Sequence, residues 1–163
     1  MRIILFSFLT LFIIAISFAQ VNMSEPSCKV RVMQKWELLS QEGKFDEAII
    51  ELNRHIDSTG NKSKHQNYWH LGQLYAFNND YDTAVQYMKK STSIFDLMFD
   101  KYWRLYYKGT IAFLQRDKEK LQKYYLKLLQ HNSAYYERNT KTLESLYLNF
   151  DEQYFDAYFF KSH

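Results

Sequence analysis

The sequence predicts an all-α fold in which antiparallel helical hairpins stack side by side. A polar turn, an aromatic residue and an alanine three positions later recur at Phe45 to Ala48 and at Tyr81 to Ala84. A weaker copy ends at Leu121, so the three anchor positions are 36 and 37 residues apart, the length of two helices with their turns. The chain of 163 residues has only one proline and four glycines, so its helices meet few breaks.

Apolar residues recur with a helical period between these turns and define the expected elements in order. The clearest loop covers residues 57–63, where Gly60 suits the end of a helix. Asp117 is placed to cap the start of a later helix through its side chain. The three hairpins are expected over 29–42 and 45–58, over 65–78 and 81–95, and over 101–115 and 118–131.

Two further helices are expected after the third hairpin, over residues 134–148 and 151–160, the second with Asp151 as its N-terminal cap. Repeat arrays need atypical terminal elements to cover their last exposed face. Residues 132–163 are therefore interpreted as C-terminal capping helices.

The second hairpin carries a recognisable motif, Tyr68-x-x-Leu71-Gly72-x-x-Tyr75 followed by Tyr81-x-x-Ala84-x-x-Tyr87. This pattern resembles the tetratricopeptide repeat over residues 65–98. The third hairpin keeps a small residue at Gly109, and the first has Trp36 where a small residue is expected. The resemblance implies a short solenoid of about three repeats, over residues 29–62, 65–98 and 102–131. A general helical-hairpin solenoid is the alternative.

The N-terminus predicts export. Met1 and Arg2 precede an apolar run from Ile3 to Phe18, and Ser17-Phe18-Ala19 forms a small-x-small cleavage site. This is typical of a signal peptide over residues 1–19, followed by a flexible segment over 20–28. An uncleaved anchor is the alternative, although the run is shorter than the roughly 20 apolar residues of a spanning helix. We expect a periplasmic or secreted protein with no membrane span in the mature chain.

The chain lacks the residue patterns of common catalytic and metal sites. Its formal net charge of +3 is too balanced to indicate a nucleic-acid partner. No two histidines have the spacing of a zinc-binding helix, and no glycine-rich phosphate loop occurs. The lone Cys28 cannot form an internal disulfide. We therefore expect that the protein is not an enzyme and holds no metal or cofactor. A buried pair of carboxylates or a His–Asp pair in the fold would reopen the possibility of a hydrolase.

Acidic residues gather at two predicted turns, as Asp80 with Asp82 and as Asp96 with Asp100. Helix capping explains acidic residues at such positions better than a pair of catalytic carboxylates.

The resemblance also implies a binding groove, because one face of the first helix of each repeat lines the concave surface in this family. The equivalent positions in the first hairpin are Val30, Met33, Glu37, Ser40 and Gln41. Aromatic side chains are typical anchors of protein interfaces, although an aromatic stripe at helical spacing equally suits a core. The candidate groove residues of the second and third hairpins are Gln66, Trp69, Gln73, Phe77, Trp103, Tyr106 and Thr110, with Ala76, Phe113 and Leu114 at neighbouring positions.

The C-terminal segment, over residues 154–160, is too apolar to remain in water. It is expected to pack within its own chain as a cap; the alternatives are the outer face of the last hairpin and a dimer contact. The residues concerned are Tyr154, Phe155, Tyr158 and Phe159.

These features together predict a module that holds a peptide or helix of another exported protein, the identity of which the sequence does not give. The alternative is a structural or assembly subunit, or a homodimer, that makes its contact through the C-terminal segment.

Overall fold

The computed structural model describes residues 32–60, 64–131 and 134–159. These residues contain helices and no strands, which confirms the predicted all-α fold. The helices are α1 (Lys35–Gln41), α2 (Phe45–Thr59), α3 (Lys64–Phe77), α4 (Tyr81–Lys90), α5 (Ile94–Phe99), α6 (Lys101–Leu114), α7 (Lys118–Leu129), the short 3-10 helix η1 (Ala134–Tyr136), α8 (Glu137–Leu148) and α9 (Tyr154–Phe159).

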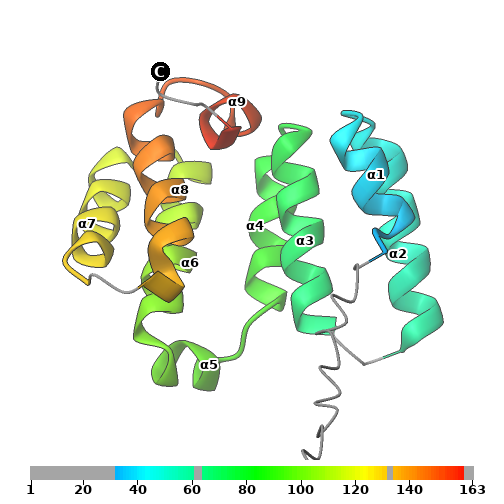
Figure 1. Cartoon of the computed structure of the whole chain (residues 1–163), viewed down its shortest axis with the longest axis horizontal. Coiled ribbons are helices and arrows are strands. Elements are labelled where there is room, and N and C mark those ends of the chain that lie inside the picture. Colours follow the sequence, from blue (N-terminus) through cyan, green and yellow to red (C-terminus); the bar gives the residue numbers. More distant parts are fainter. Residues whose placement is uncertain (1–31, 61–63, 132–133, 160–163) are drawn as a thin grey trace, which may run out of the picture. The chain divides into compact units, whose positions relative to one another are not determined.

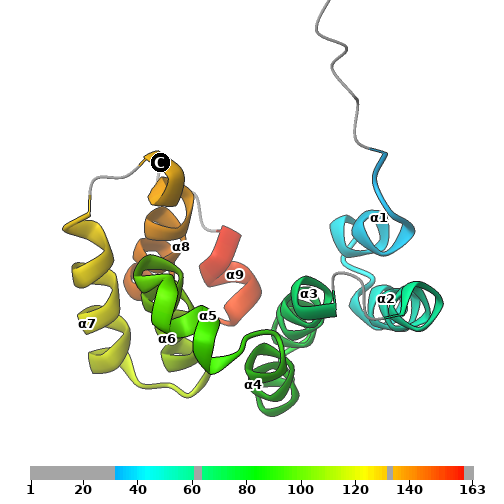
Figure 2. The same ribbon diagram turned by 90° about the horizontal axis from the view of Figure 1, so that it is seen from below.

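The helices pack in neighbouring pairs, as a helical-repeat solenoid requires. α1 packs on α2, α3 on α4, α6 on α7 and α8 on α9, and the second hairpin joins its neighbours through α2 with α3 and α4 with α6 (Figure 1). Seen from below, α9 lies between α8 and α3 (Figure 2). The last helix therefore returns along the chain to contact the second hairpin.

Aspartate side chains begin three of the helices by accepting hydrogen bonds from backbone amides in the first turn. Asp80 accepts from Thr83 N at 3.1 Å, and Asp117 accepts from Lys120 N at 2.9 Å, as predicted for Asp117. At the start of α6, Asp100 accepts from the backbone N–H groups of two successive residues. Gly60, with a φ of 64°, ends α2. Capping thus accounts for Asp80 and Asp100.

Three expected boundaries were wrong. The helix expected over 81–95 ends at Lys90, and α5 begins after Ser93, because Ser93 and Asp96 form a capping box that starts a new helix. Asp151 does not cap the last helix, which begins three residues later at Tyr154. The first helix of the described residues begins at Lys35, whereas a helix from residue 29 was expected, and residues 32–34 are not helical.

The core has two clusters that meet at α3. One joins α1, α2 and α3 around Leu52, Leu71 and Leu74, and the other continues from Trp69 through α6 and α8 to α9. Gly72 lets α3 approach α4 closely, because a Cβ there would lie 2.6 Å from the Met88 side chain and 3.0 Å from a backbone carbonyl. Since α3 contributes to both clusters, it is the central helix of the stack.

The predicted signal peptide, the segment 20–28 and Cys28 lie outside the described residues. Within the described part of the chain, no helix is long and apolar enough to cross a membrane.

Candidate functional site

An aromatic contact between the second and third hairpins forms the centre of the predicted groove. Trp69 of α3 and Trp103 of α6 meet edge to face, with ring centroids 4.8 Å apart. Tyr106 lies one helical turn beyond Trp103 and contacts both rings, at 5.7 and 5.6 Å. Trp69 is 8% exposed and Trp103 is half-buried, so the indole of Trp103 is the more accessible of the two.

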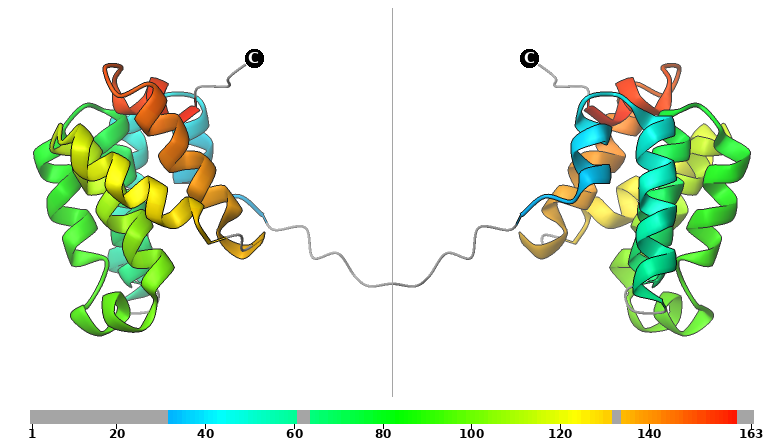
Figure 3. Two further views of the ribbon diagram at one scale, coloured as in Figure 1. Left: turned by 90° about the vertical axis from the view of Figure 1, so that its left-hand side faces the viewer. Right: turned by 90° about the vertical axis from the view of Figure 1, so that its right-hand side faces the viewer.

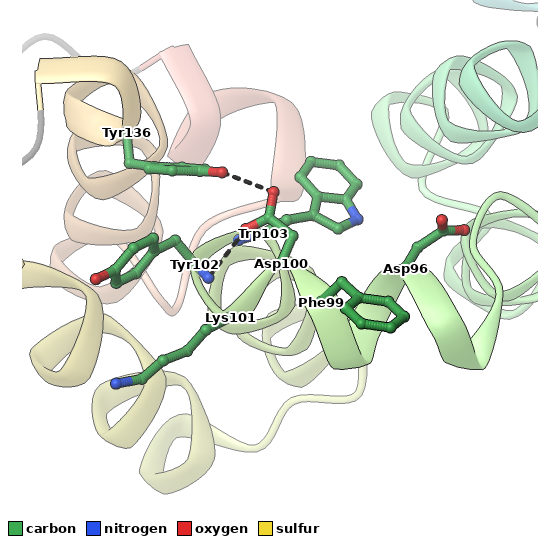
Figure 4. A pocket seen from close by; sticks show the side chains of 7 residues that line it. All are labelled: Asp96, Phe99, Asp100, Lys101, Tyr102, Trp103 and Tyr136. Atoms are coloured by element: carbon green, nitrogen blue, oxygen red, sulfur yellow. Dashed lines mark hydrogen bonds between the residues drawn. The ribbon is translucent and has the colours of Figure 1, made fainter.

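Two hollows flank Trp103 and share that residue and Asp96. The first has a volume of about 530 Å³ and lies between the starts of α3 and α6. The second has a volume of about 600 Å³ and lies beside α5 and Tyr136 (Figure 4). The first is lined by His65, Gln66, Trp69, Ser91, Thr92, Ser93, Asp96 and Trp103.

Polar groups around the hollows are held in fixed positions. Asp96 Oδ2 accepts hydrogen bonds from the backbone N–H of Ser93 at 2.9 Å and from the Ser93 hydroxyl at 2.8 Å. The bond from the Ser93 backbone contributes most, and together the two bonds hold the pKa of Asp96 below its ordinary value. The carboxylate is therefore charged at neutral pH. Asp100 Oδ2 accepts from the Tyr136 hydroxyl at 2.6 Å (Figure 4). Burial and this bond raise the pKa of Tyr136.

The other end of the predicted groove is filled by the chain itself. Phe77 of α3 contacts four aromatic rings of the C-terminal segment, all with centroid separations near 5.5 Å. Tyr154 is fully buried and also contacts Phe113. Residues 154–159 of the C-terminal segment thus pack inside their own chain. The rings around Phe77 are those of Tyr154, Phe155, Tyr158 and Phe159.

The predicted groove residues differ in their accessibility. Gln66 is exposed and Gln73 is half-buried, whereas Tyr106 is 4% exposed and Thr110 is completely buried. Burial raises the pKa values of the Tyr106 and Tyr154 hydroxyls well above the ordinary value. The structure therefore leaves Gln66 and Trp103 at the surface of this region and buries Tyr106 and Thr110.

Two buried hydroxyls, Thr110 Oγ1 on α6 and the Tyr154 hydroxyl on α9, lack a well-formed hydrogen bond among the described residues. Tyr106 lies close enough to interact with Thr110, and Gln73 with Tyr154. Misaligned contacts of this kind contribute little to stability. Burial of the two hydroxyls therefore lowers the stability of the fold locally.

The sequence did not predict the contribution of residues 91–100 to this surface. The pair Ser93 and Asp96 has the spacing of a capping box and was the available signal. Helical periodicity alone does not show the break, because Met88 and Phe95 on either side of the polar residues 89–93 keep the spacing of two helical turns. The carboxylates of this segment serve as caps, and the described residues contain no cluster of histidine, cysteine or acidic side chains able to hold a metal ion.

The family comparison agrees with the architecture. A tetratricopeptide repeat model matches residues 65–95, which cover all of α4 and nearly all of α3. The chain is a tetratricopeptide-like helical repeat protein. Neither the curated proteins nor the solved structures include a match to it. Tetratricopeptide repeats are generally non-catalytic modules for protein–protein interaction.

Proposed function

We propose that this tetratricopeptide-like protein is exported and binds a peptide segment or helix of another envelope or secreted protein at the Trp103 end of its groove. The observation that carries the proposal is the hollow lined by Trp69 and Trp103, which has an aromatic wall and a polar rim. Aromatic anchors supply much of the binding free energy in such interfaces, and polar rim groups determine register.

The Trp103 end is favoured over the Phe77 end because α9 occupies the latter. A partner segment at the Phe77 end would have to displace four aromatic rings. At the Trp103 end, Gln66 and His65 are exposed beside a half-buried indole. The partner segment is therefore expected to contact the beginnings of α3 and α6.

Export is proposed from the N-terminal sequence, in which an apolar run from Ile3 to Phe18 is followed by a small-x-small site. A partner in the periplasm or outside the cell follows from that proposal.

An assembly subunit that contacts its neighbours through the C-terminal segment is less well supported. Tyr154 and Ala157 are fully buried within their own chain. In α9, Phe159 is 55% exposed, while Phe155 and Tyr158 are half-buried. One exposed and two half-buried rings offer far less than the roughly 800 Å² per partner of a stable interface.

Site-specific photocrosslinking tests the proposed surface. A benzoylphenylalanine at position 66 is placed beside the hollow, and one at position 123 is placed on exposed α7 as the control. We expect position 66 to crosslink one envelope protein that position 123 does not, and the crosslink to disappear with Trp103→Ala. Tyr68→Ala removes a half-buried ring of α3 outside the hollow and should leave the crosslink intact. Identical products from positions 66 and 123 would refute the proposal.

A further inference from the structure

The short helix α5 exposes an unusual amount of apolar surface. Four of its six residues are large apolar side chains with exposed fractions between 63% and 85%. Only Leu97 among its apolar residues is partly buried and packs on the core. Single exposed apolar residues are normal, but a contiguous group marks a contact site. We call the four residues the α5 patch: Ile94, Phe95, Met98 and Phe99.

The α5 patch is presented by a well-anchored turn of helix. The capping box of Ser93 and Asp96 fixes its start, and the Arg104 guanidinium donates to the carbonyl of Leu97 at 3.0 Å. At its end, Asp100 caps α6 directly. The helix itself lies beyond the lower ends of α4 and α6 (Figure 1, Figure 3). Its exposed apolar side chains are therefore carried by a segment that is held at both ends.

Positive charges surround the patch. Because the hairpins are antiparallel, the end of α4 and the starts of α3 and α6 lie at the same edge as α5 (Figure 1). These termini carry Lys89 and Lys90, Lys64, and Lys101. None of the four forms a salt bridge with an acidic group in the described part of the chain, and three of them lie over tyrosine rings at 5.0 to 6.0 Å.

The nearest acidic groups are engaged in local bonds. Asp96 binds Ser93, and Asp100 binds backbone amides and the Tyr136 hydroxyl. Farther along this edge, Glu137 pairs with Lys141, while exposed Asp57 lies near the end of α2. These bonds leave Asp96 and Asp100 negatively charged. Among the described residues of this edge, the four lysines still outnumber the carboxylates without a salt bridge, Asp96, Asp100 and Asp57, so the patch is apolar at its centre and cationic on balance around it.

We propose that the α5 patch docks onto an anionic membrane surface, with its side chains inserted shallowly among the lipids. An apolar face beside lysines is the arrangement by which helices bind the interface of anionic bilayers, and aromatic rings favour that depth. A second copy of this chain suits the patch less well. A six-residue helix offers less than the roughly 800 Å² per partner of a stable dimer, and two-fold pairing would bring the lysines of both copies together. The α5 patch adjoins the proposed peptide site, since Ser93 and Asp96 line its hollow, but none of the four patch residues lines that hollow, and the inference does not rest on the proposed function.

Vesicle flotation tests the inference, with residues 20–163 so that the apolar N-terminal run does not contribute. Both core clusters lie between Trp36 and Ala157, so this chain retains every described core residue. We expect flotation with vesicles of phosphatidylcholine and phosphatidylglycerol, and much less with phosphatidylcholine alone. Phe95→Ser/Phe99→Ser should weaken binding at least about tenfold.

The matched control is Ile50→Ser/Leu148→Ser, which removes two side chains exposed by 59% and 65% on α2 and α8. It should bind like the parent. Lys89→Gln/Lys90→Gln should weaken binding about fivefold per lysine, and added salt should reduce the affinity of the parent. Circular dichroism checks that the serine variant folds. If it does not, Phe99→Trp replaces it and keeps the patch apolar. Brominated lipids should then quench the fluorescence that the new tryptophan adds to that of the parent.

Three results would overturn the proposal. The first is no binding to anionic vesicles, and the second is equal loss in the patch variant and its control. The third is a protein contact instead of a lipid one: a dimer in sedimentation equilibrium that depends on Phe95 and Phe99, or a specific protein crosslinked by benzoylphenylalanine at position 98. Failure of the peptide site would appear only in the position 66 crosslink, so the two proposals are tested separately.

Discussion

Replacing Tyr154 with alanine measures how much the C-terminal helix contributes to the stability of the solenoid. The side chain is completely buried and its ring contacts Phe77 and Phe113 at centroid separations of 5.5 and 5.6 Å. Truncation of a fully buried aromatic residue costs about 3–5 kcal/mol. Because α9 is terminal and can detach locally, we expect a value near the lower end, about 3 kcal/mol.

The backbone anchors of α9 remain in this variant. Tyr81 Oη accepts from the backbone N–H of residue 154 at 3.0 Å, and the Ser145 hydroxyl donates to the Ala157 carbonyl at 2.6 Å. The loss therefore reports on ring packing. At about 2–4 °C per kcal/mol for a domain of this size, the melting temperature should fall by about 6–12 °C.

Tyr154→Phe is the control, because it keeps the ring and removes a buried hydroxyl without a well-formed bond. It should be neutral or stabilising by up to about 1 kcal/mol. Urea unfolding followed by far-ultraviolet circular dichroism measures both variants. Deleting residues 151–163 should destabilise at least as much as the alanine variant. An unchanged unfolding midpoint after Tyr154→Ala or after the deletion would show that α9 does not stabilise the fold.

Three further predictions follow from the same contacts. Gly72→Ala should cost about 1–3 kcal/mol because its Cβ meets backbone atoms of α4, whereas Gly109→Ala, which meets only a leucine side chain 2.7 Å away, should cost less; thermal unfolding ranks the two. Asp100→Ala should cost about 1–2 kcal/mol through loss of the α6 cap, and Asp100→Asn should recover part of it in urea titrations. Stability should fall as pH rises above about 10, by up to about 1.4 kcal/mol per pH unit for each buried tyrosine, because unfolded tyrosines lose protons there while Tyr106 and Tyr154 have raised pKa values. Tyr154→Phe should flatten that pH dependence, and an unchanged slope would contradict the assignment.

Much of the fold could be read from local patterns. The turns before Phe45 and Tyr81 and the cap at Asp117 are set by residues close in sequence, so a one-dimensional pattern predicts them. The break at residues 91–93 was missed because Met88 and Phe95 on either side of it keep a helical spacing, and periodicity does not register a capping box between them. The start of α9 was missed for a different reason: its position is fixed by contacts with Phe77 and Phe113, which are far away in the chain.

The candidate site was predicted only in part. The repeat resemblance brought Trp69 and Trp103 together in advance, because equivalent helices of adjacent repeats lie side by side. It gave no indication that α9 packs on Phe77, or that residues 91–100 line both hollows. The predicted aromatic side chains divide between groove and core: Trp103 is accessible, and Tyr106 is buried.

The sequence by itself determined the helical class, the repeat length and the central tetratricopeptide-like hairpin, because these depend on periodicity and on residues within one or two turns of each other. The tertiary structure alone decided which aromatic faces remain open. Burial of a side chain depends on which distant segment covers it, and the sequence gives each helix an apolar face without naming the helix that packs there. For this protein, α9 covers the Phe77 end of the groove and nothing among the described residues covers the α5 patch.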